Sequence, residues 1–174
     1  TLAALKTADL ASDLNMAAHD DDAEVRIAAR RLLAKHFPAG AIESLLAGLQ
    51  ATSTAERQSA LHALAALKDK RAEDALFVWT ERLAKGKAPA DLQLDLIEIA
   101  EQSDDERFRK LLQQYAATRD TNDPLSAYRE CLEGGNAARG ESIVWGRTAA
   151  SCRRCHKVGD NGGEVGPDLT EIGS

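Results

Sequence analysis

Apolar residues recur every three or four positions through most of the first 118 residues, which is the spacing of an amphipathic α-helix. The pattern predicts helices over residues 20–36, 41–49, 56–67, 72–85 and 104–118. Acidic side chains at 20–22 and 24 lie where the positive end of the first helix dipole would be, and residues 52–54 offer N-cap hydroxyls for the third helix. Residues 37–40 (Phe-Pro-Ala-Gly) end the first helix.

Part of this helical pattern repeats. The sequence Arg26-Ile27-Ala28-Ala29 and the sequence Arg57-Gln58-Ser59-Ala60 lie about 31 residues apart, and each runs into a Leu-Ala pair. A weaker third copy begins at Pro89. Helix pairs that repeat in this way cannot bury their apolar stripes alone, so they stack on their neighbours into an α-solenoid.

Residues 1–118 resemble HEAT repeats. The resemblance depends on Asp22-Ala23-Glu24-Val25-Arg26, followed by alanine and leucine at the positions that would pack. It implies a solenoid that acts as a scaffold. An irregular helical bundle with coincidental periodicity is the alternative interpretation.

The character of the chain changes after residue 118. Residues 119–124 are polar, end in Asp-Pro and have no apolar period, which predicts a linker. Residues 125–132 then predict a short helix that ends at Gly134-Gly135. Glycines are frequent from there on, so the expected organisation is a helical domain over 1–118, a linker over 119–124 and a second domain over 125–174.

Composition narrows the fold class and the partners. Hydrophobic residues make up 44% of the 174 residues but aromatics only 4%, and alanine and leucine dominate, which favours an all-α fold. A net charge of -6 argues against a nucleic-acid partner, because phosphates are bound by basic surfaces. No apolar run reaches the roughly 18 residues that a membrane span requires. The chain starts at Thr1 without a signal segment, so we expect a fragment of a longer protein.

The chemistry of the sequence is concentrated in Cys152-Arg153-Arg154-Cys155-His156, which has the form C-x-x-C-H of a c-type haem attachment site. Two thiols separated by two residues in a tight turn can each bond to a vinyl group on one porphyrin edge, and the adjacent imidazole can bind the iron. C-x-x-C also occurs in zinc sites and in thioredoxin-like redox sites. Zinc would need a fourth ligand, and a thioredoxin site would need a strand-to-helix junction.

The surroundings of the motif resemble a cytochrome c domain. Residues 134–143 resemble the first helix of such domains, and residues 162–173, with Gly166-Pro167-Asp168-Leu169, resemble the segment that follows the haem-binding turn. The resemblance is closest to the haem-binding domain at the C-terminus of large planctomycete and verrucomicrobial proteins. It implies a class I-like fold, of which this chain has the N-terminal part.

The same resemblance assigns roles to individual residues. Cys152 and Cys155 would hold haem c, His156 would bind its iron, and the carbonyl of Pro167 would accept the Nδ1 proton of His156. Val144 stands where the family commonly has an aromatic residue, with Trp145 beside it. The second axial ligand and the last helix of the family would lie beyond Ser174.

Two other sulfur-containing residues are expected to be structural. The only methionine, Met16, is expected to fill a gap in the core, and Cys131 is expected to be a small buried side chain on a helix.

The sequence therefore predicts electron transfer through a covalent haem c, with the helical repeats as a scaffold, in the periplasm or another exported location. The chain is not expected to be an enzyme by itself. Its expected partner is a redox protein or a dehydrogenase domain fused to it in the full-length protein. The alternative is a HEAT-like protein-interaction scaffold whose C-x-x-C-H binds zinc or is redox-active without haem.

Overall fold

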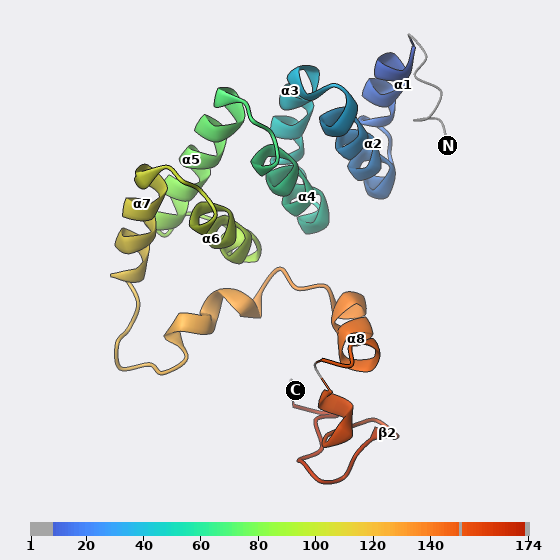
Figure 1. The fold of residues 1–174 in the computed structure, drawn as a ribbon, viewed down its shortest axis with the longest axis vertical. Coiled ribbons are helices and arrows are strands. Elements are labelled where there is room, and N and C mark those ends of the chain that lie inside the picture. Colours follow the sequence, from blue (N-terminus) through green and yellow to red (C-terminus); the bar gives the residue numbers. More distant parts are fainter. Residues whose placement is uncertain (1–8, 150, 173–174) are drawn as a thin grey trace. The chain divides into compact units, whose positions relative to one another are not determined.

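The structure is a computed structural model that describes residues 9–149 and 151–172 (Figure 1). Most of these residues are helical, and the strands among them are limited to one short hairpin, so the all-α class is confirmed. The chain forms two compact units that divide between Gly134 and Gly135. None of the described helices is long and apolar enough to cross a membrane.

The first unit is a succession of paired helices (Figure 1). They are α1 (Leu10–Ala17), α2 (Ala23–His36), α3 (Pro38–Gly48), α4 (Thr54–Ala65), α5 (Lys70–Ala84), the 3-10 turn η2 (Ala90–Leu92), α6 (Gln93–Glu101) and α7 (Glu106–Ala116). Each helix from α1 to α7 packs on the next. In addition, α4 contacts both α2 and α6, while α5 contacts both α3 and α7. Alternate helices therefore form two layers.

Side-chain caps decide where several of these helices begin. Asp22 accepts a hydrogen bond from the backbone N–H of Glu24 over 2.8 Å, and Ser53 caps α4 in the same manner. Asp69 and Asp105 cap α5 and α7. Each cap satisfies an N–H group that the first helical turn leaves without a partner.

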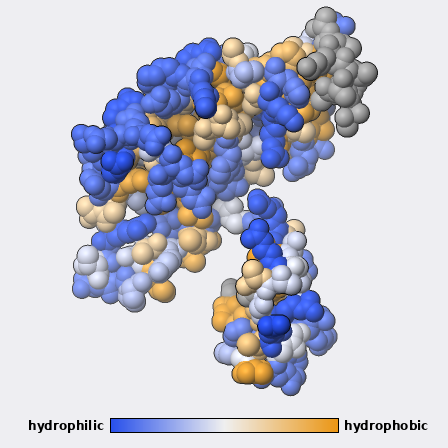
Figure 2. All heavy atoms as spheres, viewed as in Figure 1, coloured by the Kyte–Doolittle hydropathy of each residue, from blue (hydrophilic) through white to orange (hydrophobic). Residues whose placement is uncertain are grey.

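The core lies between the two layers. Its fully buried side chains are mostly leucines, contributed by every helix from α2 to α7 or by the turns beside them: Leu33, Ile42, Leu45, Leu49, Leu61, Leu64, Leu83, Leu92, Leu96 and Phe108. Phe77 meets Phe108 edge to face, with ring centroids 5.6 Å apart. The face of this unit seen in Figure 2 is largely hydrophilic. Burial of the apolar stripes is what stabilises the stack of helices.

A charged group is buried in this unit as well. The carboxylate of Glu56 on α4 is 2% exposed and pairs with Arg26 and Arg30, two residues one turn apart on α2. Arg26 Nε donates to Glu56 over 2.9 Å, and Arg30 Nη2 also donates to the carbonyl of Ala18 over 3.1 Å. The hydrogen bond from Arg26 is the main cause that holds the pKa of Glu56 below its usual value, against the opposite effect of burial.

The segment after α7 belongs to the first unit. In the 3-10 helix η3 (Ser126–Leu132), the buried side chain of Glu130 accepts a hydrogen bond from Arg119 over 2.8 Å. Gln58 donates to the carbonyl of Gly134 over 3.0 Å. A Cβ atom at Gly134, whose φ is +75°, would lie 2.3 Å from the carbonyl oxygen of Asp91, so only glycine fits there. These contacts put the division at Gly134, beyond the linker expected over 119–124.

Two expectations about single residues are wrong. Met16 is 68% exposed on α1, and Cys131 is exposed on η3. Met16 lies on the side of α1 away from the buried Leu10 and Leu14. Glu130 is the one fully buried residue of η3, and the neighbouring Cys131 is exposed.

The second unit is small. It contains α8 (Ala137–Gly146), the 3-10 turn η4 (Cys152–Arg154), and strands β1 (Lys157–Val158) and β2 (Asn161–Gly162), which pair antiparallel. Asn136 caps α8 through the N–H of Arg139. No side chain among the described residues of this unit is buried. Its order therefore depends on backbone contacts rather than on an apolar core.

We expect Glu56→Gln to destabilise the first unit by about 3 kcal/mol, because it leaves two arginines without a carboxylate beside them. Urea unfolding followed by circular dichroism measures the change. Glu81→Gln is the matched control, since Glu81 forms an exposed pair with Lys85 on α5. Its loss is expected to cost less than about 0.5 kcal/mol. Equal effects of the two substitutions would contradict the structural role of Glu56.

The lowered pKa of Glu56 also predicts a pH dependence. A carboxylate whose pKa is lower in the folded state stabilises the fold above its unfolded pKa, about 4.3 for Glu, and loses this effect as pH falls through the folded value. The difference in unfolding free energy between the wild type and Glu56→Gln is therefore expected to shrink below about pH 4. A difference that stays constant down to pH 2 would contradict it.

Candidate functional site

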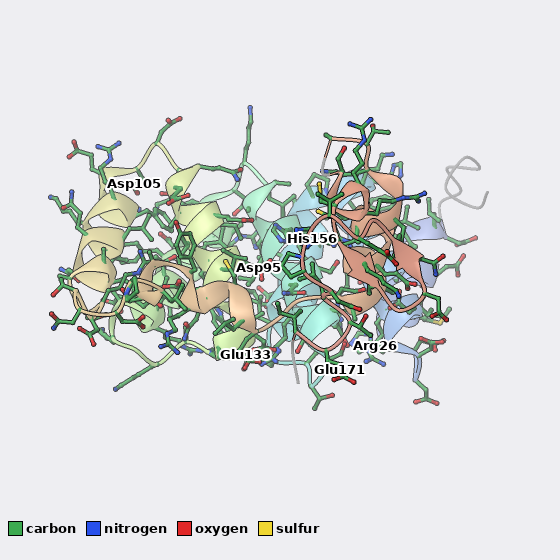
Figure 3. The ribbon with its side chains drawn as sticks, turned by 90° about the horizontal axis from the view of Figure 1, so that it is seen from below. Arg26, Asp95, Asp105, Glu133, His156 and Glu171 are labelled. Carbon is green, nitrogen blue, oxygen red and sulfur yellow. The ribbon has the colours of Figure 1, made fainter. Side chains whose placement is uncertain are left out.

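The C-x-x-C-H motif forms a single helical turn after α8. The backbone N–H groups of Cys155 and His156 both donate to the carbonyl of Cys152, over 3.2 and 3.0 Å. Ser151 enters the turn with a φ of +45°, an uncommon value for a residue with a side chain. Both thiol side chains are exposed, and the imidazole of His156, labelled in Figure 3, is half-buried. Three of the four predicted site residues thus share one turn.

The fourth predicted residue orients the imidazole. Nδ1 of His156 lies 2.9 Å from the carbonyl oxygen of Pro167. A carbonyl can only accept, so Nδ1 carries the proton and donates it. Nε2 then holds the lone pair of the neutral ring and is the atom that can bind a metal.

The glycines after the motif allow the backbone to approach it. The N–H of Gly163 donates to the carbonyl of Arg153 over 2.8 Å, and the N–H of Gly166 donates to that of Cys155 over 2.6 Å. A Cβ atom at Gly163 would lie 2.1 Å from the carbonyl oxygen of Arg154. At Gly166 it would lie 2.8 Å from Cε1 of His156. Any larger residue at these positions would displace the turn or the ring.

Sequence reasoning missed the role of Gly163 and Gly166. The sequence pattern marks Gly163 as one of several glycines after the motif and Gly166 as part of the Gly166-Pro167-Asp168-Leu169 segment, and it predicts no contact for either. The available signal was the spacing Gly-Gly-x-x-Gly-Pro directly after the motif. Because glycine has no side chain, glycines at this spacing allow the backbone after the motif to pack closely against the C-x-x-C-H turn.

The segment after Pro167 is fixed by hydrogen bonds to the hairpin. The N–H of Leu169 donates to the carbonyl of Lys157, and the hydroxyl oxygen of Thr170 accepts from the N–H of Gly159, both over 2.9 Å. Hydrogen bonds from the hydroxyl and the N–H of Thr170 lower the pKa of Asp168. The residues directly after Pro167 are therefore joined to β1 and to the turn that follows it.

Trp145 and Arg153 lie on another side of the turn. The guanidinium of Arg153 is 5.8 Å from the centroid of the Trp145 ring and donates to the Trp145 carbonyl over 3.3 Å. Together with Asn161, Gly162 and Gly163 they line an open hollow. An arginine, an amide and an aromatic ring at one hollow can bind a carboxylate or another anion.

Apolar side chains of the second unit remain uncovered. Ile143 is 43% exposed, Val165 88% and Ile172 76%. The half-buried Trp145 is the only large aromatic residue of this unit. The described residues contain no group of three or more His, Cys, Asp or Glu side chains arranged to hold a metal ion.

No protein-family model, curated protein or solved structure matches this chain.

The contact between Gly166 and the imidazole can be tested without any cofactor. We expect the His156 ring to be protonated at Nδ1 in its neutral form, seen as a two-bond proton–nitrogen correlation at slightly alkaline pH. Gly166→Ala is expected to push the ring off the Pro167 carbonyl and mix the two tautomers. Gly140→Ala is the control, because nothing lies within 4 Å of a Cβ atom there. A tautomer unchanged by Gly166→Ala would contradict the contact.

Proposed function

We propose that this chain is an electron-transfer module that carries a covalent haem c on Cys152 and Cys155, with His156 as an iron ligand. The observation that carries the proposal is the 2.9 Å contact from Nδ1 of His156 to the Pro167 carbonyl, in the same turn that exposes both thiols. The contact leaves Nε2 as the metal-binding atom of an imidazole whose orientation is set.

The residues present fit a porphyrin in three respects. The thiols are accessible to a large planar group, and Gly166 adds no side chain beside the imidazole. Uncovered apolar residues such as Val165 and Ile172 offer contacts to an apolar macrocycle.

Each cysteine would attach to the haem by an addition reaction. The sulfur of each cysteine forms a bond to one carbon of a vinyl group, and the thiol hydrogen ends on the other carbon. Nothing leaves, and each addition converts a thiol and a C=C bond into a thioether. The haem iron, once bound, supplies one-electron redox chemistry.

The protein residues then have separate tasks. His156 binds iron through Nε2 and donates through Nδ1 to Pro167, which sets the plane of the ring. The hydrogen bond also increases the basicity of the ligand, one of the levers on a haem potential. The glycines keep the backbone close enough for the Pro167 carbonyl to reach the ring.

We infer that the first unit is a HEAT-like solenoid that serves as the scaffold. The supporting features are its paired helices, the contacts of α4 with α2 and α6, and those of α5 with α3 and α7. The partner would be a redox protein, or a dehydrogenase domain of the same polypeptide, in an exported location. The second unit corresponds to the N-terminal part of a cytochrome c domain.

The test directs the 174-residue chain to the periplasm of a host that attaches haem c. We expect a haem that stays with the denatured polypeptide, identified by its pyridine haemochrome spectrum and by mass. Cys155→Ala weakens or abolishes attachment, and the double substitution Cys152→Ala with Cys155→Ala abolishes it. Cys131→Ala is the matched control, because this exposed cysteine lies outside the motif and should leave attachment unchanged.

An unmodified polypeptide from a host that matures other c-type cytochromes would refute the proposal. One equivalent of zinc without a Soret band would favour the interaction scaffold in its place.

A further inference from the structure

The first unit has a hollow of about 520 Å³ between two of its helix-to-helix turns. One turn joins α4 to α5, and the other joins α6 to α7 (Figure 1). Every residue that lines the hollow belongs to the first unit, so this space is separate from the C-x-x-C-H turn. Its volume is in the range of ligand-binding pockets in proteins.

The floor of the hollow is apolar. Leu76 of α5, Ile99 of α6 and Phe108 of α7 are core residues, and all three line the hollow. Leu67, in the turn after α4, is half-buried and lines it as well. An apolar side chain that entered this space would contact the core directly and would be removed from water.

The carboxylates at the rim of the hollow already have cationic partners. Asp69 accepts hydrogen bonds from the guanidinium of Arg71, and these are the main cause that lowers the pKa of Asp69. Glu73 accepts a hydrogen bond from Arg107 over 2.9 Å. Neither arginine lines the hollow. Lys70, also at the rim, pairs with a carboxylate one turn further along α5. These charges are therefore neutralised within the chain.

The remaining polar groups at the rim can donate hydrogen bonds. Lys68 is exposed, and no carboxylate among the described residues forms an ion pair with it. The hydroxyl oxygen of Ser103 accepts from the N–H of Asp105 over 3.2 Å, so its hydrogen is left to donate. The amide of Gln102 adds two N–H groups. Donors of this kind beside an apolar floor match a carboxylate that accompanies an apolar group.

We propose that this hollow is a docking site for a segment of a partner protein in which an acidic residue is adjacent to a leucine or a phenylalanine. The apolar side chain of the partner fills the space over Leu76, Ile99 and Phe108. Its carboxylate pairs with Lys68 and accepts the hydrogen bond that Ser103 can donate. The inference goes beyond the proposed function, because none of these contacts requires a haem.

A protein segment suits the hollow better than a free carboxylic acid. Sites for free small ligands enclose most of the ligand surface. This hollow is open to solvent, so it covers one side chain and leaves the rest of a ligand in water. In a peptide, the residues on either side of the buried side chain add contacts with the two turns. A free acid has no such residues.

The test titrates the nitrogen-15-labelled chain of 174 residues with a capped peptide, Glu-Glu-Leu-Phe-Glu-Glu, and follows the backbone amide signals by NMR. We expect the signals of residues 65–73 and 99–108 to shift, and those of the second unit to stay in place. One control peptide has lysines in place of the glutamates, and another has serines in place of leucine and phenylalanine. Each is expected to bind roughly ten-fold more weakly.

Variants of the chain test the same contacts. Lys68→Glu is expected to raise the Kd of the peptide roughly five-fold at low salt, because it reverses the cation at the rim. Lys87→Glu is the matched control, since Lys87 is an exposed lysine beyond the other end of α5. Ala65→Phe places a ring in the hollow without changing any charge, and we expect it to abolish binding. Ala65 is exposed at the end of α4, so circular dichroism should show an unchanged helix content.

A chain that does not bind the peptide, or that binds the lysine peptide equally well, overturns the docking site. So does a Lys68→Glu variant with wild-type affinity. If 4-phenylbutyrate binds as tightly as the peptide, the hollow takes free acids and the protein-docking proposal is wrong. Self-association that Lys68→Glu abolishes would place a second copy there and would also refute it. The titration needs no haem, so a failure of haem attachment removes the proposed function alone.

Discussion

The order of the helical unit depends on the buried ion pairs that the carboxylate of Glu56 forms with two arginines. This carboxylate joins α4 to two arginines of α2, one of which also reaches the carbonyl of Ala18 after α1. Burying charged groups costs free energy because they lose their hydration. Their mutual attraction offsets this cost only when the hydrogen-bond geometry is good. The pairing therefore fixes how two successive helix pairs are offset, which contacts between leucines alone would specify less strictly.

The second unit has a defined backbone although almost none of its side chains are packed. Its turn is closed by carbonyls of Cys152, Arg153 and Cys155, and glycines bring the returning chain within hydrogen-bond distance. None of its described side chains is buried. Such a unit has a defined backbone around an uncovered site, which is the arrangement that a covalently attached group could complete. The proposal of a haem follows from this combination, and the apolar residues that remain exposed are consistent with it.

Much of the helical unit could be predicted because its signals are local. Helix periodicity and the Asp and Ser caps are readable from neighbouring residues. The ion pairs of Glu56 join residues 26 and 30 positions apart, so no local pattern reveals them. The burial of Cys131 and Met16 was predicted wrongly, since residue type gives a preference for the core and tertiary contacts decide it.

The candidate site was predictable to a similar extent. The motif located the thiols and the imidazole, and the resemblance to cytochrome c domains pointed to Pro167. The close approach of Gly163 and Gly166 was not foreseen, because glycine frequency does not say which carbonyl a glycine will face.

The acceptor that holds the imidazole is a main-chain carbonyl, and this choice has a consequence for acid tolerance. A carboxylate in that place would lose its negative charge in acid, which would weaken its hydrogen bond to the ring. The carbonyl of Pro167 gains no proton over the same range, and Nδ1 remains a donor whether the ring is neutral or cationic. The hydrogen bond that orients His156 is therefore available in acidic as well as in neutral solution.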